Sequence, residues 1–154
     1  MTQNQVINIR IAKASDVPFI IHSQLQMAEE TENLKLNNEV LSLGVRAVLA
    51  DSQKGQYFIA ECGGELAGML LTVPEWSDWR NGTVLWIHSV YIQTQFRKMG
   101  IYKKLYSHLK DLVEKSPHLR GLRLYVDKRN LNAQLVYRAL GMDNQHYELF
   151  EWLK

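Results

Sequence analysis

Apolar and polar residues alternate with a period of two in several short segments, a pattern typical of half-buried β-strands. The first segment runs from Ile7 to Ile11. Gly63-Gly64 separates two further apolar segments and favours a tight hairpin turn between them. Residues 75–82, after Pro74, are predicted to form a loop. The predicted strands cover residues 7–11, 56–61, 66–73, 83–92, 122–126 and 147–153.

Between the strands, apolar residues recur every three or four positions, which indicates helices with one buried face. Ser15-Asp16 is a suitable N-cap for the first helix, and Ser116-Pro117 ends the third. Gly141 is a typical stop signal after the fourth. The predicted helices cover residues 17–28, 36–51, 100–115 and 133–140.

The order of these elements, β-α-α-β-β-β-α-β-α-β, indicates a mixed α/β fold around a central sheet. The chain has 154 residues and no repeat or linker, so residues 1–154 are expected to form a single domain. A chain of this length buries roughly 68–70% of the surface that its unfolded form exposes. It can therefore build a core without disulfides or structural metal.

The charge balance is nearly neutral, with 18 Lys and Arg against 16 Asp and Glu and a net charge of +2. This excludes a disordered polyelectrolyte and argues against a dedicated nucleic-acid-binding protein. Cys62 has no second cysteine to pair with, which favours the reducing cytoplasm. Met1 to Gln5 does not resemble a signal peptide, and no segment approaches the ~20 apolar residues of a membrane span. We therefore expect a cytoplasmic protein that does not cross a membrane.

The most informative segment runs from Val90 to Tyr102 and combines a strand, a short basic loop and a helix start. The first backbone N–H groups of a helix have no intrahelical acceptor and lie at the positive end of its dipole, so they attract phosphate. Gly100 allows close approach to the backbone, and Arg97 offers several donors to a pyrophosphate. The spacing fits neither a Walker loop nor a dinucleotide fingerprint. From these residues alone, a solvated basic helix start explains the segment equally well.

Two blocks of the sequence resemble one enzyme family. Residues 97–102, Arg-Lys-Met-Gly-Ile-Tyr, resemble the R/Q-x-x-G-x-G/A signature of the GNAT N-acetyltransferase superfamily. Residues 130–142 resemble its N-x-x-A-x-x-x-Y-x-x-x-G-F/M segment, and the resemblance covers nearly the whole chain from Ile7 onward. It implies a GNAT fold, with a twisted, mixed and mostly antiparallel central sheet of about six to seven strands flanked by about four helices. It also implies acetyl-CoA as cosubstrate and a homodimer.

The resemblance implies a role for each matching residue. Val90, Tyr91 and Ile92 would lie along the pantetheine arm, with the backbone groups of Val90 and Ile92 pairing with it as a strand does. Asn130 matches the asparagine that lies along the cofactor, and Tyr137 matches the tyrosine that protonates the departing thiolate. The pyrophosphate would be held mostly by main-chain N–H groups of Arg97, Lys98, Met99, Gly100, Ile101 and Tyr102.

Two residues of the first block depart from the signature. Tyr102 stands where the family usually has glycine or alanine, so its side chain has to point away from the phosphates, beside the buried stripe of Ile101 and Leu105. Lys98 replaces a frequent glycine. That replacement is harmless if the backbone there is ordinary, and it adds charge near the phosphates.

Tyr137 and His88 are the expected general acid and general base. Helical spacing alone makes Tyr137 a core residue, but the family match favours catalysis, because a phenol is protonated at neutral pH and can donate to a thiolate. In the predicted alternation His88 shares a face with Trp86 and Val90. A histidine exchanges protons near neutral pH and suits a base. A histidine that is merely hydrogen-bonded in a packed sheet fits the sequence equally well.

The acceptor side is expected in the acidic run Glu29, Glu30 and Glu32 and in the loop with Trp76 and Trp79. Carboxylates and indole rings would hold a cationic amine by charge and cation–π contact, with Glu29 and the two tryptophans as the candidate residues. A solvated helix end and a dimer interface are the alternatives. The histidines show no metal-ligand spacing, so we expect no metal.

Together with the candidate residues, the resemblance implies an N-acetyltransferase that moves the acetyl group of acetyl-CoA to a primary amine by direct attack in a ternary complex. The acceptor is expected to be a small cationic amine. One alternative is a catalytically impaired acetyl-CoA-binding module with a regulatory role. A nucleic-acid patch at Arg97, Lys98, Lys103 and Lys104 is disfavoured by the net charge of +2, so nucleic acid is not expected as a partner.

Overall fold

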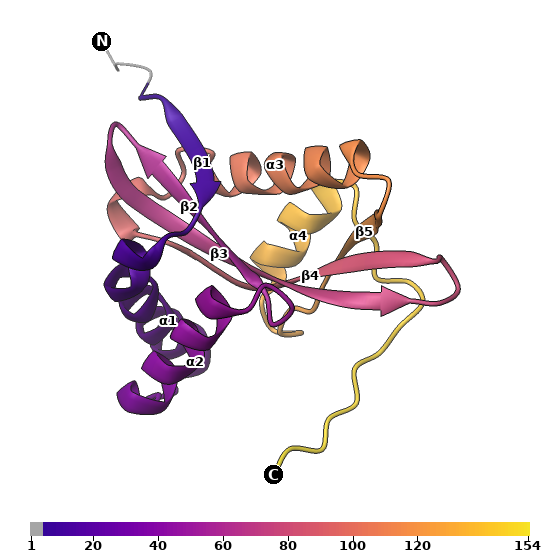
Figure 1. Cartoon of the computed structure of the whole chain (residues 1–154), viewed down its shortest axis with the longest axis horizontal. Helices are drawn as coiled ribbons and strands as arrows, with labels where there is room; N and C mark the ends of the chain where they lie inside the picture. Colours follow the sequence, from indigo (N-terminus) through magenta and orange to yellow (C-terminus); the bar gives the residue numbers. More distant parts are fainter. Residues whose placement is uncertain (1–4) are drawn as a thin grey trace. The chain divides into compact units, whose positions relative to one another are not determined.

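The structure is a computed structural model that describes residues 5–154, so most of the polar start at Met1 to Gln5 lies outside the described residues. The chain forms two compact units, an N-terminal unit up to Arg123 and a C-terminal unit from Leu124 to Lys154. The elements are β1 (Ile7–Ile11), α1 (Val17–Glu32), α2 (Asn38–Ala50), β2 (Gln56–Cys62), β3 (Glu65–Ser77), β4 (Gly82–Ile92), α3 (Ile101–Lys115), β5 (Leu119–Leu124) and α4 (Leu131–Ala139) (Figure 1).

One five-stranded sheet in the order β1-β2-β3-β4-β5 forms the centre of the N-terminal unit. Its first four strands pair antiparallel. The N–H of Thr83, at the start of β4, donates to the carbonyl of His118, just before β5, at 2.9 Å. Both strands therefore begin side by side and run parallel, with α3 as the crossover between them. The expected mixed, mostly antiparallel α/β fold is confirmed, but the sheet has five strands and not six to seven.

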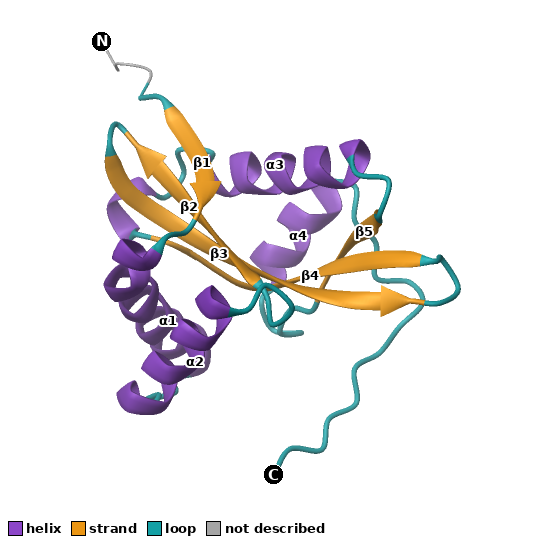
Figure 2. Ribbon diagram, in the orientation of Figure 1, coloured by secondary structure: helices purple, strands orange, loops and turns teal. Residues whose placement is uncertain are grey.

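The two faces of the sheet are covered by different helices, because successive side chains of a strand point to opposite faces. Ile20 of α1 and Val45 of α2 pack with Ile59, Met69 and Tyr91 in one buried cluster. On the other face α3 buries a stripe at helical spacing, and its His108 ring lies 5.5 Å from the ring of Phe58. Figure 2 shows helices on both sides of this sheet.

The segment after Pro74 is the first difference from the predicted elements, since β3 continues to Ser77. The loop predicted from residue 75 is therefore wrong for its first three residues, and only residues 78–81 form the turn. The reason is the edge of the sheet: β2 pairs with β3 only as far as Thr72, so Pro74 lies where β3 has β4 on one side alone. A proline without an N–H is tolerated at such an edge.

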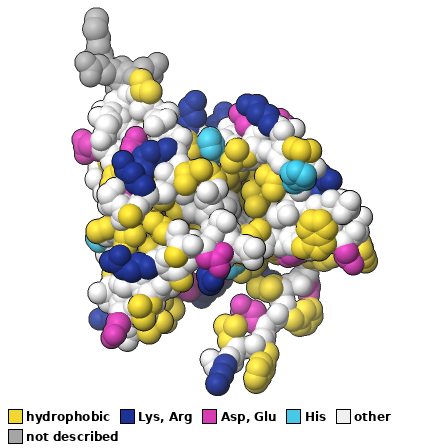
Figure 3. All heavy atoms as spheres, viewed as in Figure 1, with side chains coloured by type: hydrophobic (Ala, Val, Ile, Leu, Met, Phe, Trp, Pro, Cys, Tyr) yellow, Lys and Arg dark blue, Asp and Glu magenta, His cyan; other side chains and the backbone are white. Residues whose placement is uncertain are grey.

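The C-terminal segment is the second difference, because the strand predicted at residues 147–153 is not formed. Within the C-terminal unit, α4 ends at Ala139 and no further helix or strand is described. Alternation assigns side chains to two faces, but a strand also needs a partner for its backbone groups. Large apolar side chains of this segment stay exposed, among them Phe150 at 89% and Trp152 at 90%. Figure 3 shows hydrophobic side chains at the surface along the C-terminal end of the chain.

Candidate active site

A β-bulge in β4 determines where His88 lies. Leu71 pairs with Ser89 and the next residue of β3, Thr72, pairs with Ile87, so His88 is the extra residue of the bulge. His88 is exposed. Because the bulge shifts the alternation, Trp86 and Val90, which pair with Val73 and Leu70, lie on opposite faces of the sheet. The prediction that His88 shares a face with both of them is therefore wrong.

The end of β4 has one edge that β5 does not reach. β4 has 11 residues and β5 has six. Because the two strands begin side by side, β5 ends about level with Ser89 at a rise of ~3.3 Å per residue. On the other edge, Val90 and Ile92 pair with Leu70 and Gly68 of β3. The backbone groups of Val90 and the N–H of Ile92 can therefore pair with an extended ligand along the edge beyond β5, whereas the Ile92 carbonyl already accepts from Nε of Arg97.

The loop that follows β4 has a special backbone at two residues. A 3-10 turn at Thr94–Phe96 buries the Phe96 side chain. Lys98 then adopts a φ of 65°, and Gly100, the N-cap of α3, adopts a φ of 80°. Both values lie in the left-handed region, which favours glycine. The replacement of glycine by Lys98 was expected to be harmless only with an ordinary backbone. The positive φ shows that the backbone is not ordinary, so the lysine occupies a strained position.

The start of α3 fits a phosphate. The first N–H groups of this helix have no intrahelical acceptor, and its first turn contains no acidic residue. A Cβ built on Gly100 meets no heavy atom within 4 Å, so the backbone there faces open space. An anion can approach these N–H groups closely and gain from the helix dipole.

Tyr102 does not cover this helix start. Its neighbours Ile101 and Leu105 belong to the buried stripe of α3, and the hydroxyl oxygen of Tyr102 is itself buried. The side chain therefore points into the protein, as expected from the sequence. The aromatic residue at this position leaves the approach to the backbone N–H groups open.

The side chain of Arg97 is engaged elsewhere than expected. Its Nε donates to the carbonyl of Ile92 at 2.9 Å, and its Nη2 lies 2.7 Å from Oε2 of Glu30. The guanidinium also lies 5.5 Å from the centre of the Tyr91 ring. These contacts were not predicted, because Glu30 is 67 positions away in sequence.

The C-terminal unit contains the other two expected site residues. Asn130 is the N-cap of α4, and its side-chain oxygen accepts from the N–H of Ala133 at 3.1 Å. Tyr137 is half-buried on α4, and Gly141 ends this region with a φ of 87°, as expected for a stop signal. The capping role of Asn130 occupies its oxygen and leaves its amide nitrogen for a ligand.

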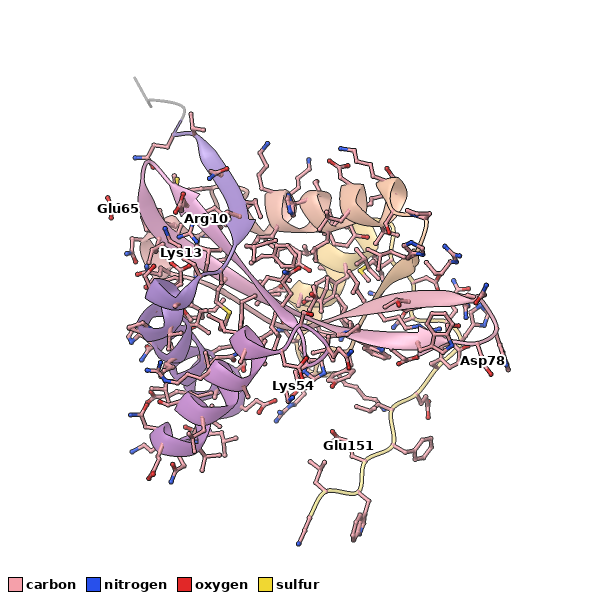
Figure 4. The ribbon with its side chains drawn as sticks, viewed as in Figure 1. Arg10, Lys13, Lys54, Glu65, Asp78 and Glu151 are labelled. Carbon is pink, nitrogen blue, oxygen red and sulfur yellow. The ribbon has the colours of Figure 1, made fainter. Side chains whose placement is uncertain are left out.

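The three candidate acceptor residues do not lie together. Trp76 pairs with Thr83 near the β3–β4 turn, whereas Glu30, the neighbour of Glu29, contacts Tyr91. From Thr83 to Tyr91 the strand extends about 25 Å. Figure 4 shows Asp78 at the tip of this hairpin, far from α1. One small amine therefore cannot contact both Glu29 and the tryptophans.

Sequence reasoning missed a second charged cluster on β3, β4 and β5. The indole Nε1 of Trp86 donates to Oε2 of Glu75 at 2.6 Å. Arg123 donates to Oε1 of the same carboxylate at 3.2 Å, and its guanidinium lies 6.0 Å from the Trp86 ring. Glu75 is thus neutralised by its neighbours. Its assignment to a loop hid the register that brings these residues together.

Two kinds of feature are absent from the described part of the chain. Residues 5–154 contain no group of three or more His, Cys, Asp or Glu side chains arranged to hold a metal ion. None of the helices described has the length and apolar character needed to cross a lipid bilayer.

Comparison with known proteins explains this geometry. A family model described as the acetyltransferase (GNAT) family matches residues 22–142. A crystal structure of a possible acetyltransferase from Clostridium difficile 630 is 37% identical, with a TM-score of 0.91 over 97% of this chain and 98% of that chain. This chain belongs to the GNAT acetyltransferase family.

More distant structures share the fold. The aminoglycoside N-acetyltransferase AAC(6')-Iy, solved in complex with CoA, is 15% identical with a TM-score of 0.79, over 100% of this chain and 99% of that chain. An aminoglycoside acetyltransferase from an uncultured soil metagenomic sample is 19% identical with a TM-score of 0.74, over 96% and 97%. No match was found among curated proteins.

Family membership gives the residues at the start of α3 their chemical context. As a GNAT acetyltransferase, this protein is an acyltransferase that depends on acetyl-CoA as cosubstrate. The open backbone N–H groups after Gly100 suit the pyrophosphate of such a cosubstrate, and the part of β4 beyond β5, from Val90 onward, suits its extended arm.

Proposed function

We propose that this GNAT acetyltransferase is an N-acetyltransferase that transfers the acetyl group of acetyl-CoA to a primary amine, and that the acceptor is small and cationic. The open helix start at Gly100, which follows the end of β4 by a short loop, is the observation that carries the proposal. Aminoglycoside acetyltransferases among the structural neighbours support a small amine as acceptor.

The proposed reaction is a direct attack in a ternary complex. The amine nitrogen forms a bond to the thioester carbonyl carbon, and a backbone N–H near Val90 stabilises the oxyanion. The carbon–sulfur bond then breaks, and Tyr137 donates its hydroxyl proton to the departing thiolate. His88, or a water that it orders, takes the proton that the amine loses. Its place in a bulge supports this role, since bulges often occur beside active sites.

The two parts of the predicted acceptor site receive separate roles in this proposal. Glu29 follows directly before Glu30, whose carboxylate contacts Arg97, so Glu29 is close to the acetyl-CoA loop and is the proposed partner of the cationic amine. Trp76 and Trp79 are exposed at the far hairpin and fit the alternative role in contact with a second copy.

Replacement of Tyr137 by phenylalanine tests the proposed function. We expect kcat to fall by about 100-fold or more, because general acid catalysis contributes at least this much, while the Kd for acetyl-CoA stays within about twofold. The measurement is free CoA release with a panel of polyamines, amino acids, aminoglycosides and peptide N-termini. Unchanged turnover of Tyr137→Phe would remove this residue as the acid. Release with none of the amines would favour the impaired acetyl-CoA-binding module.

We further propose a single acetyltransferase domain over residues 1–154 that acts as a cytoplasmic homodimer. The match of the family model to residues 22–142, which include parts of both compact units, supports the single domain. The exposed apolar side chains at residues 147–153 support an interface with a second copy. The single Cys62 is consistent with a reducing compartment.

A further inference from the structure

The last turn of α1 concentrates negative charge. It contains Glu29, Glu30 and Glu32 and no basic residue, and its C-cap Asn33 has a φ of 50°. The C-terminal end of a helix carries the negative end of its dipole, so acidic side chains there are unfavourable unless a cation lies nearby. A cation from another element is therefore needed to stabilise this helix end.

Arg97 supplies that cation from the acetyl-CoA loop. Its guanidinium pairs with Glu30 at 2.7 Å and donates to the Ile92 carbonyl at 2.9 Å. It also lies over the Tyr91 ring, and the Tyr91 hydroxyl donates to the other oxygen of Glu30 at 3.5 Å. These four residues, Glu30, Tyr91, Ile92 and Arg97, are called the Arg97 clasp below.

The clasp joins three elements at one point. Tyr91 and Ile92 end β4, Arg97 begins the basic part of the loop, and Glu30 belongs to α1. Tyr91 is buried, and its pKa is raised chiefly by that burial and further by the negative charge of Glu30. The buried Tyr91 ring therefore forms one side of the clasp, and the guanidinium of Arg97 lies against it.

The contacts within the Arg97 clasp make the side chain of Arg97 less available to bind phosphate. Two of its donor groups already have acceptors in the protein, and its charge is compensated by Glu30. The pyrophosphate is then left to the backbone N–H groups that follow Lys98. The direction of these N–H groups depends on the path of the loop. The hydrogen bond from Arg97 to the Ile92 carbonyl fixes this path at the point where the loop leaves β4.

We propose that Glu30 is a positioning residue for acetyl-CoA binding, which holds Arg97 so that the loop between β4 and α3 keeps the shape that accepts pyrophosphate. This rests on the function proposed above. It assigns Glu30 to the cosubstrate side of the reaction, whereas the acidic run as a whole was expected to bind the amine. It also links α1 to the acetyl-CoA loop.

Removal of the Glu30 carboxylate should change the affinity for acetyl-CoA, and the direction of this change distinguishes a positioning role of Glu30 from direct phosphate binding by Arg97. If Arg97 bound the phosphates directly, Glu30 would compete for it, and removing the carboxylate would tighten acetyl-CoA binding. If Glu30 positions the loop, removing its charge weakens binding although it takes a negative charge away from a polyanionic ligand. The two side chains are 39% and 40% exposed, so the effect is expected to be modest.

The experiment compares Kd values for CoA, measured by calorimetry on the full chain, for wild type, Glu30→Gln, Arg97→Gln and the double variant. We expect each single substitution to weaken binding about two- to fivefold and the double variant to be no weaker than Arg97→Gln alone. Glu114→Gln, which removes an exposed carboxylate from the end of α3, is the matched control and should bind as wild type. Tighter or unchanged binding by Glu30→Gln would overturn the proposal.

Kinetics provide a second readout that a general loss of stability would not reproduce. Glu30→Gln should raise KM for acetyl-CoA and leave KM for the amine unchanged, and Glu30→Asp, which keeps the charge, should recover part of the loss. A rise in KM for the amine alone would overturn the proposal and make Glu30 an acceptor residue. A wild type that binds CoA but acetylates no amine would overturn the proposed function only, because the Kd comparison still decides the role of Glu30.

Discussion

Lys98 has a backbone φ of 65°, where a side chain is strained and glycine is not. We predict that Lys98→Gly unfolds with a free energy about 1 kcal/mol higher than Lys98→Ala. At ordinary positions alanine is the more stable of the two. Both variants lack the lysine charge, so the comparison isolates the backbone, and guanidinium denaturation measures it. An alanine variant as stable as the glycine variant would show that the loop relaxes to a negative φ.

Asp16 is only 3% exposed and accepts two hydrogen bonds from Arg10, at 2.7 and 3.0 Å, and one from the N–H of Lys13, at 2.8 Å. The bonds from Arg10 are the main reason why the pKa of Asp16 is lowered. A lowered folded pKa contributes stability that is present above the unfolded value of ~3.9 and is lost as the pH falls through the folded value.

We therefore predict that Asp16→Asn lowers the free energy of unfolding by about 1–3 kcal/mol at pH 7, because the Arg10 guanidinium loses its charged acceptor. Below pH 4 the difference between variant and wild type should shrink, because Asp16 is then protonated in the unfolded chain and, at still lower pH, in the folded protein as well. Urea denaturation between pH 2 and pH 7 measures both effects, with exposed Asp111→Asn as control. A difference that is constant over this range would contradict the role of the charge.

At the scale of elements, Gly68 determines how closely β3 approaches the end of β4. A Cβ at Gly68 would lie 2.6 Å from the side chain of Ile92 and 2.8 Å from the carbonyl oxygen of Tyr91. We predict that Gly68→Ala displaces this end of β4 and raises the Kd for CoA several-fold, with a loss of about 1–3 kcal/mol in stability. Calorimetry and denaturation measure the two effects. Gly44→Ala on α2, where a Cβ meets nothing within 4 Å, is the control.

The elements themselves were largely predictable, whereas the contacts between them were not. The start of α3 after Gly100 and the end of α4 before Gly141 were predicted, since both depend on local backbone preferences. The bulge at His88 was missed because one extra residue leaves the β-branched and aromatic composition of the strand unchanged. The pairing of Glu30 with Arg97 depends on α1 packing against β4, which no local pattern contains.

At the scale of the whole molecule, the net charge of +2 averages over local patches of opposite sign. Within the N-terminal unit the acidic end of α1 meets the basic loop before α3 through Glu30 and Arg97. One of the loop cations is thus neutralised internally, and Lys98 is exposed beside the helix start. The proposed pyrophosphate site consists of backbone N–H groups at a helix start, which leave no mark on the amino-acid composition, so composition alone does not reveal it.

The apolar side chains of the C-terminal segment, residues 147–153, are so exposed that burying them in a monomer contributes little to its stability. If a second copy covers them, we predict that the double substitution Phe150→Ser and Trp152→Ser shifts the protein from dimer to monomer at micromolar concentration. Size-exclusion chromatography with light scattering measures the mass. Val40→Ser, which removes a single exposed apolar side chain from α2, should leave the dimer intact. A wild type that is monomeric at every concentration, or a double variant that stays dimeric, would contradict the proposed interface.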